Sequence, residues 1–324
     1  MLTVNNKKIC ELCFSEFPLF SDTCSQCDGK CLNEQKGGTW LAKGTILAGR
    51  YLVGKTISYS HIYFCYDLNT NSRLIVYEYF PYGFASRVEG GNTLVYSDTV
   101  LDINFPDDQG IGTFITEAKK FYKIGRSPYF FNICDLFYEN NTAYCILEYI
   151  DFQRIKPYSP ENEALYIMMQ LMDALEHLHN HGMVYKYLNY LDILVDKEKN
   201  IKLYPFCETR KMLDDLFSVY HDAVPVFRGS VELFRSNGHI GPWTDIFSLG
   251  EIIYKMITGR TPEFSVERLS GNEYIDPTGI STEFYLILNK MLKTKSQDRY
   301  QNINELRHDV NLLKLKPKPP FYFS

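Results

Sequence analysis

Short hydrophobic and β-branched runs, separated by polar turn residues, dominate residues 50–149. Asparagine-rich turns such as 69–72 and 140–141 lie between these runs. This alternation predicts a meandering antiparallel sheet. Within it, apolar residues three or four positions apart predict one helix over 114–124.

From residue 151 onward, the spacing of apolar residues becomes typical of helices. Residues 159–161 (Ser-Pro-Glu) predict a helix start, and Gly182 predicts its end. The stretch 243–257 is apolar on nearly every face, so we expect a buried central helix. A β-rich lobe, a short connection at 149–152 and a helical lobe together predict an α+β, two-lobed body with a cleft between the lobes.

Composition narrows the class of protein. The 324 residues are 45% hydrophobic, which is enough for a substantial core and excludes disorder as the dominant state. The net charge of -5 provides no global basic field to hold nucleic acid. No apolar run approaches the roughly 18 to 20 residues of a membrane helix, so we expect a cytoplasmic protein with no membrane contact.

Five of the nine cysteines lie near the N-terminus. Four of them form two C-x-x-C pairs with ten residues between the pairs: Cys10, Cys13, Cys24 and Cys27. Two tight turns can present four thiolates to a tetrahedral ion, which predicts a zinc cofactor and a zinc ribbon. A disulfide-linked segment is the alternative. Cys31 is a spare thiol, and we expect so short a segment to unfold without metal.

Seven short motifs then carry a resemblance to a known family. They are Glu78-Tyr79-Phe80-Pro81, Glu117-Ala118, Asn141-Thr142-Ala143-Tyr144, Leu147-Glu148-Tyr149, Gly241-Pro242-Trp243-Thr244-Asp245, Thr258-Gly259 and Asp298-Arg299-Tyr300. Their order and spacing resemble the bacterial serine/threonine protein kinases of the eukaryotic type. The resemblance implies a protein-kinase-like fold, with a small β-rich N-lobe carrying one helix and a larger helical C-lobe.

The cysteine spacing, the polar stretch that follows it and the kinase resemblance together set the expected segments. We predict a zinc ribbon over 1–36, a linker over 37–48, a kinase-like domain over 49–313 and a tail over 314–324. The N-lobe covers 49–149, and the C-lobe covers 150–313.

Kinase chemistry needs a glycine loop, a lysine paired with a helix glutamate, a loop aspartate and metal ligands. Where relatives have the glycine loop, residues 57–62 read Ile-Ser-Tyr-Ser-His-Ile, and Tyr77 stands at the lysine position. Glu117 is therefore expected to lack its usual partner. The resemblance leaves a vestigial nucleotide cleft at Ser58, Ser60, Tyr77, Glu117, Glu148 and Asp192.

The catalytic-loop and metal-binding motifs differ as well. Tyr187 stands at the catalytic aspartate position, Asn189 at the loop lysine, and Asp192 at the asparagine that binds metal. Residues 205–207 read Pro-Phe-Cys where the family has Asp-Phe-Gly, so Pro205 replaces a metal ligand. With these five positions changed (Tyr77, Tyr187, Asn189, Asp192 and Pro205), we predict no catalytic residue and no enzyme activity.

Packing residues of the family remain in place. Phe206 and Asp245 are kept, and Glu232 and Arg299 match a C-lobe ion pair. The main hypothesis is thus a pseudokinase that acts as a scaffold or allosteric partner of other proteins, with at most weak nucleotide binding.

Two other functions stay open. One is a divergent ATP-binding kinase or other transferase that uses Asp192 and Glu208 with a divalent ion. The other is nucleic-acid binding by the zinc ribbon, regulated by the kinase-like body, although the charges of the ribbon are mixed.

Several side chains also have a purely structural interpretation. Tyr77, Tyr187 and Tyr190 are expected to fill the vacated nucleotide site. A histidine cluster (His177, His179 and His181) suggests a metal site, but residues two apart on a helix do not share a face, so we favour packing. Cys207 has no basic neighbour in sequence and is expected to be inert.

Overall fold

A computed structural model describes most of the chain. The described residues are 2–4, 7–18, 24, 39–58, 61–81, 84–96, 107–155, 158–206, 209, 229–235, 237–263, 265–268, 278–313 and 317. They form two compact units. The first unit takes its described residues from Met1–Gly125, Asn132–Ile150 and Thr209–Pro225, and the second takes them from Arg126–Phe131, Asp151–Glu208 and Val226–Ser324.

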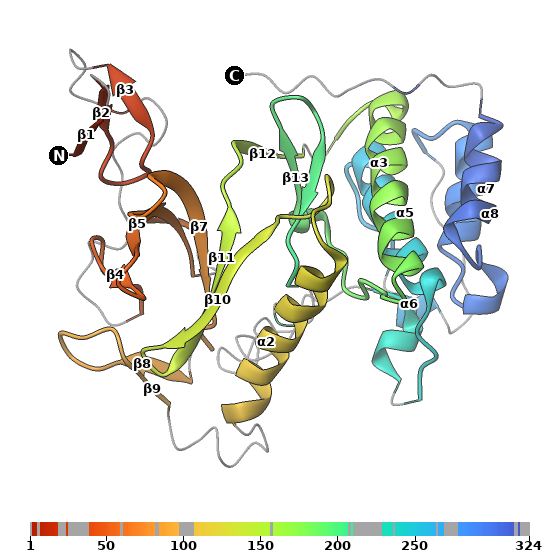
Figure 1. Ribbon diagram of the computed structural model, residues 1–324. Helices are drawn as coiled ribbons and strands as arrows, with labels where there is room; N and C mark the ends of the chain where they lie inside the picture. Colours follow the sequence, from red (N-terminus) through yellow and green to blue (C-terminus); the bar gives the residue numbers. More distant parts are fainter. Residues whose placement is uncertain are drawn as a thin grey trace. The chain divides into compact units, whose positions relative to one another are not determined.

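An antiparallel sheet is the centre of the first unit (Figure 1). Its strand order is β10-β11-β7-β6-β5-β4. The strands are β4 (Ile46–Leu47), β5 (Tyr51–Ser58), β6 (Ile62–Asp67), β7 (Ser72–Glu78), β10 (Ile133–Glu139) and β11 (Thr142–Glu148). Asn71, Asn140 and Asn141 have positive φ angles of 53°, 53° and 59°, which asparagine tolerates, so the predicted turns join neighbouring strands.

Three smaller elements join this sheet in the first unit. Helix α2 (Asp107–Ile124) packs on β10 and β11. A hairpin pairs β8 (Ala85–Arg87) with β9 (Leu94–Tyr96), and an N-terminal sheet has the order β1 (Leu2–Val4), β2 (Lys7–Ile9) and β3 (Glu16–Pro18). The predicted helix 114–124 is therefore confirmed and begins seven residues earlier, at Asp107.

The interval 37–48, predicted to be a linker, contributes to the core of the first unit. Strand β4 lies within it, and the side chains of Leu41 and Leu47 are fully buried in the cluster around Tyr51 and Val53. The described part of this interval is thus packed against the sheet. Burial of the two leucine side chains stabilises this arrangement by several kcal/mol.

Helices make up most of the second unit (Figure 1). Helix α3 (Glu161–Asn180) packs on α5 (Pro242–Thr258) and α8 (Ile303–Asn311), and α7 (Thr282–Met291) packs on α5 and α8. The short helix α6 spans Ser265–Arg268. As predicted, α5 is buried along nearly its whole length, and Gly182 takes a left-handed φ of 69° just after α3.

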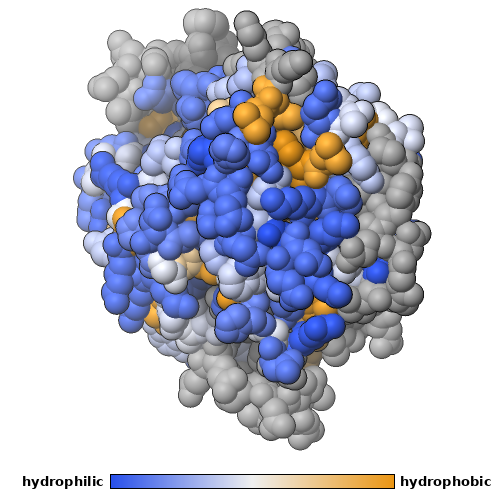
Figure 2. All heavy atoms as spheres, turned by 90° about the vertical axis from the view of Figure 1, so that its right-hand side faces the viewer, coloured by the Kyte–Doolittle hydropathy of each residue, from blue (hydrophilic) through white to orange (hydrophobic). Residues whose placement is uncertain are grey.

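A small antiparallel sheet completes the second unit. It pairs β12 (Phe152–Arg154), β13 (Ile193–Asp196) and β14 (Ile201–Leu203), with the 3-10 helix η2 (Tyr190–Asp192) directly before β13. Two further 3-10 turns are η3 (Val231–Phe234) and η4 (Ser296–Asp298). The face drawn in Figure 2 is mostly hydrophilic, with a hydrophobic patch near its top and smaller hydrophobic spots scattered elsewhere. Among the described residues, every helix is too short or too polar to cross a bilayer.

Candidate active site and metal centre

The loop after α3 is held by one buried carboxylate of α5. Asp245 accepts hydrogen bonds from the backbone N–H groups of Tyr185 (2.8 Å) and Lys186 (2.7 Å). It also lies 2.8 Å from Nε2 of His179. Lys186 has a positive φ of 71°, which is strained for a residue with a side chain. The two charge-assisted bonds to Asp245 offset that strain and fix the loop.

Asn189 and Asp192 cap each other within this loop. The Asn189 side chain accepts from the N–H of Leu191 (3.0 Å), and Oδ2 of Asp192 accepts from the N–H of Asn189 (2.7 Å). The Asp192 side chain is buried at 2% exposure. The loop therefore positions a buried carboxylate directly before β13, at the position where the resemblance places the family's metal-binding asparagine.

Aromatic residues fix the remainder of the loop. The Tyr190 hydroxyl donates to the carbonyl of Ile155 (2.6 Å), and the Tyr185 hydroxyl donates to that of Tyr204 (2.9 Å). Burial raises the pKa of Tyr190, so its hydroxyl keeps its proton. Pro205 and Phe206 are buried just after β14, whereas Cys207 and Glu208 lie outside the described residues.

In the first unit, Tyr77 packs toward α2. It lies on β7 between Ile62 and Cys145 of the neighbouring strands, and its ring meets Phe114 edge to face at 5.5 Å. Its neighbour Glu78 has different contacts: Arg87 donates to it at 2.6 Å, and the hydroxyls of Tyr63 and Tyr144 donate to it at 3.1 Å. Sequence reasoning missed Arg87, because nothing around this residue resembles a motif.

Glu117 hydrogen-bonds to a residue other than the lysine that relatives use. Its Oε2 accepts from the backbone N–H (3.0 Å) and the hydroxyl (2.8 Å) of Thr209. Both side chains are buried. The sequence pattern did not indicate this contact, in which a neutral hydroxyl and a backbone amide stabilise a buried carboxylate.

The other positions of the predicted cleft are placed as follows. Glu148 ends β11 and accepts from the backbone N–H (3.2 Å) and the amide group (2.7 Å) of Asn132. Ser58 ends β5 opposite Ile62, while Ser60 lies outside the described residues. Ser58, Tyr77, Glu117 and Glu148 belong to the first unit, and Tyr187, Asn189, Asp192 and Pro205 belong to the second.

The predicted ion pair in the second unit is confirmed. Arg299 donates to both carboxylate oxygens of Glu232, at 2.7 and 3.1 Å, and its guanidinium lies 4.7 Å from the ring centroid of Phe247. Burial alone would raise the pKa of Glu232, but its bonds with Arg299 and the charge of Arg299 outweigh burial and lower that pKa.

In the predicted histidine cluster, His179 has a structural contact, as the packing interpretation predicted. His179 contacts Asp245, as described above, and so supports the loop. The ring centroids of His177 and His181 lie 4.8 Å apart.

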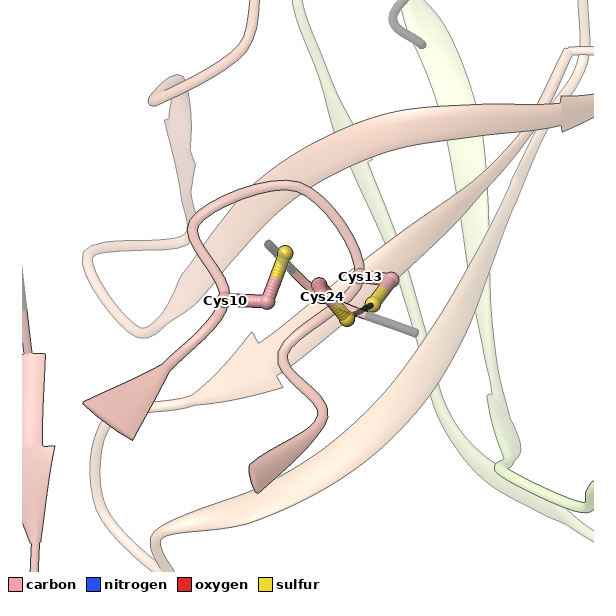
Figure 3. Close-up of side chains that lie close together, drawn as sticks. All are labelled: Cys10, Cys13 and Cys24. Carbon is pink, nitrogen blue, oxygen red and sulfur yellow. Dashed lines mark hydrogen bonds between the residues drawn. The ribbon is translucent and has the colours of Figure 1, made fainter. Parts of the chain in front are cut away.

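Three of the four predicted zinc ligands come together (Figure 3). The sulfur atoms of Cys10, Cys13 and Cys24 lie within 4.8 Å of one another, and all three side chains are buried. Those of Cys13 and Cys24 are 3.6 Å apart, which is longer than a disulfide bond. Three clustered thiols can bind a metal ion. The predicted fourth ligand, Cys27, and the spare thiol Cys31 lie outside the described residues.

Comparisons with known proteins identify the family. The pattern of the protein kinase domain matches residues 104–310. A probable serine/threonine-protein kinase MARK-C of Dictyostelium discoideum is 30% identical over 188 residues, which are 52% of this chain and 23% of that protein. The chain thus spans about a quarter of the length of that relative.

Solved structures agree on the fold. A structure titled "PpkA-294 apo form" has a TM-score of 0.71 at 22% identity, covering 83% of this chain and 99% of that one. The PknI kinase domain of Mycobacterium tuberculosis, as a double mutant, has a TM-score of 0.59 at 15% identity, covering 84% and 98%. The predicted fold, with a β-sheet N-lobe and a helical C-lobe, is confirmed.

The prediction that the chain is not an enzyme is contradicted. The relatives are serine/threonine protein kinases, and nothing in the comparisons shows that catalytic residues are lost. The prediction equated each changed motif position with lost chemistry. In phosphoryl transfer, however, the protein mainly positions the reactants and stabilises charge, and these tasks can be carried by other groups.

Proposed function

Because the chain belongs to the protein kinase domain family, we propose that it transfers the γ-phosphoryl group of ATP to a serine or threonine hydroxyl of a protein. Its kinase relatives span much longer chains, so the substrate class follows from the family alone. One observation carries the proposal. Asp245 accepts two backbone hydrogen bonds from the loop after α3, and this loop carries the buried carboxylate of Asp192.

Asp192 is the residue we assign to the nucleotide's divalent ion. Carboxylate oxygens suit Mg²⁺, and the ion supplies charge stabilisation to the transferring phosphoryl group. The cap formed with Asn189 determines where this carboxylate lies. A tyrosine such as Tyr187 is a poor proton acceptor at neutral pH, because a phenol has a pKa of about 10. The loose transition state needs little help from a base, so we expect slow but measurable turnover.

Labelled ATP with Mg²⁺ or Mn²⁺ and a mixed serine/threonine peptide library tests this function. Asp192→Ala should abolish transfer, whereas Asp192→Asn keeps an oxygen that can accept from the Asn189 N–H and should retain the fold. Asp151, which is partly exposed and paired with Lys197 at 2.6 Å, offers a matched control, and Asp151→Ala should leave transfer unchanged. Wild-type protein that binds ATP but transfers no phosphate with either metal would refute the assignment.

We also propose that the ion held by the three clustered thiols is zinc. A d¹⁰ ion accepts three or four thiolates in tetrahedral geometry, and a cytosolic C-x-x-C pair is more typical of zinc than of a disulfide. Elemental analysis of the purified chain should find one zinc per protein, lost in Cys24→Ser and kept in Cys134→Ser. Iron in place of zinc, or no bound metal, would contradict this identity.

A further inference from the structure

The turn that carries two of the cysteines lies directly on the sheet of the first unit. We call residues 10–15 the cysteine turn. It closes on itself, because the N–H of Phe14 donates to the carbonyl of Cys10 (2.8 Å) and the N–H of Cys10 donates to that of Ser15 (3.0 Å). Phe14 takes a left-handed φ of 57° within it. Such a turn presents Cys10 and Cys13 side by side (Figure 3).

Strand β5 contacts the cysteine turn through its backbone. The N–H of Lys55 donates to the carbonyl of Leu12 at 2.7 Å. A Cβ atom at the adjacent Gly54 would lie 2.3 Å from that carbonyl oxygen and 2.7 Å from the Phe14 ring. The close approach therefore depends on glycine at position 54.

Side chains of β6 and β7 hold the same turn. Phe14 is 2% exposed and packs on Tyr66, with ring centroids 5.5 Å apart. Nε of Arg73 donates to the carbonyl of Cys13 at 3.1 Å, and its guanidinium lies 3.6 Å from the ring centroid of Tyr149. The cysteine turn thus contacts β5, β6 and β7, all within one unit.

The sulfur geometry suits a bound ion. Metal–sulfur bonds of about 2.3 Å in a tetrahedron place the sulfurs about 3.8 Å apart, close to the 3.6 Å between Cys13 and Cys24. The N–H of Leu12 lies 3.4 Å from the Cys10 sulfur and can donate to a thiolate. A bound ion would fix the conformation of the turn, and with it the atoms that contact the sheet.

We propose that a zinc-class ion on Cys10, Cys13 and Cys24 fastens the cysteine turn to β5–β7, so that metal occupancy controls the stability of this sheet. The cysteine turn is then a structural part of the first unit. The inference deepens the proposed zinc site and does not depend on phosphoryl transfer.

Hydrogen exchange on the full chain tests the coupling. Protein stripped with a chelator is compared with protein reloaded with Zn²⁺, and Co²⁺ serves as an optical probe through its thiolate charge-transfer absorption. Bound metal should slow hydrogen exchange of the backbone amides of residues 51–58 by about tenfold or more. An ion that binds only the folded cysteine turn also stabilises the strand that this turn contacts. Equal exchange of these amides with and without metal would overturn the proposal, and so would absence of the cobalt–thiolate band.

A glycine substitution separates binding from coupling. Gly54→Ala should keep the cobalt–thiolate band but lose most of the metal-dependent protection of β5, because the added Cβ displaces the turn. Gly112→Ala on α2 meets no atom within 4 Å and should behave like the wild type. Undiminished protection in Gly54→Ala would contradict the docking step. Absence of phosphoryl transfer would change neither the cobalt–thiolate band nor the hydrogen exchange. The proposed metal coupling and the proposed kinase activity can therefore be refuted independently.

Discussion

Thr209 donates both its hydroxyl and its backbone N–H to the carboxylate of Glu117, at 2.8 and 3.0 Å, and both side chains are buried. This contact anchors Thr209 to helix α2. Thr209 closely follows residues 205–207, which stand where the family has its metal-binding motif. It also means that the Thr209 hydroxyl is engaged inside the unit, which makes it a poor acceptor for a modifying kinase.

Thr209→Val should destabilise the protein by about 1–3 kcal/mol, because it leaves a buried carboxylate with one donor fewer. Thr209→Ser keeps the hydroxyl and should cost much less. Urea unfolding of both variants measures the difference. Equal stability of Thr209→Val and wild type would show that this contact contributes nothing.

Breaking the Glu232–Arg299 ion pair should cause a large loss of folding stability. Arg299→Met would leave the Glu232 carboxylate buried without its partner, at an expected cost of about 3–5 kcal/mol. The exposed pair of Lys197 and Asp151 provides the comparison, and Lys197→Met should cost less than about 1 kcal/mol. Thermal unfolding of both variants tests the contrast, which similar losses would disprove.

His61 predicts a pH dependence of stability. Its ring is 4% exposed and stacks on Phe80 at 4.0 Å. Burial, and next the charge of Arg87, lower the pKa of His61 from 6.5 to about 3. The folded state therefore binds fewer protons than the unfolded chain, so stability is complete above pH 6.5 and is lost as the pH falls toward 3.

The slope attributable to His61 should approach about 1.4 kcal/mol per pH unit within this window. His61→Asn removes the titration and tolerates the left-handed φ of 55°. Unfolding free energies measured between pH 7 and pH 4 should then vary less than in the wild type, while the exposed His181→Asn should keep the full slope. An unchanged slope in His61→Asn would assign the effect to other groups.

Asp245→Asn should disturb the loop after α3. An amide offers one acceptor oxygen to the N–H groups of Tyr185 and Lys186, whereas the carboxylate offers two. We expect a loss of about 1–3 kcal/mol and faster hydrogen exchange at 185–187. Exchange at these amides that matches the wild type would show that the loop holds its shape without the carboxylate.

Much of the fold follows from local patterns. The spacing of apolar residues and the Gly182 stop predicted α3, the apolar character of every face predicted α5, and the asparagine turns predicted antiparallel strands that follow one another along the chain. The Glu232–Arg299 pair was predictable because both residues belong to motifs of a family with a shared fold. Local rules worked for the helices and the turns because neighbouring residues determine the structure there.

The rest depends on contacts between distant segments. Thr209 hydrogen-bonds to Glu117, which lies 92 positions away in sequence. The N–H of Lys55 on β5 donates to the carbonyl of Leu12 in the cysteine turn. No local pattern marks such pairs. The prediction about activity failed for another reason. The motif residues are one solution to phosphoryl transfer, whereas the reaction requires that the reactants be positioned and that charge be stabilised, which other groups can do.

Phosphate transfer from labelled ATP, measured for wild type, Asp192→Asn and Asp192→Ala under identical metal concentrations, decides whether this chain is a kinase that depends on Asp192. We expect transfer by the wild type, reduced transfer by Asp192→Asn and none by Asp192→Ala, with all three proteins shown to be folded by thermal unfolding. Wild-type protein that carries nucleotide and metal yet transfers nothing would contradict it, as would an Asp192→Ala variant as active as the wild type.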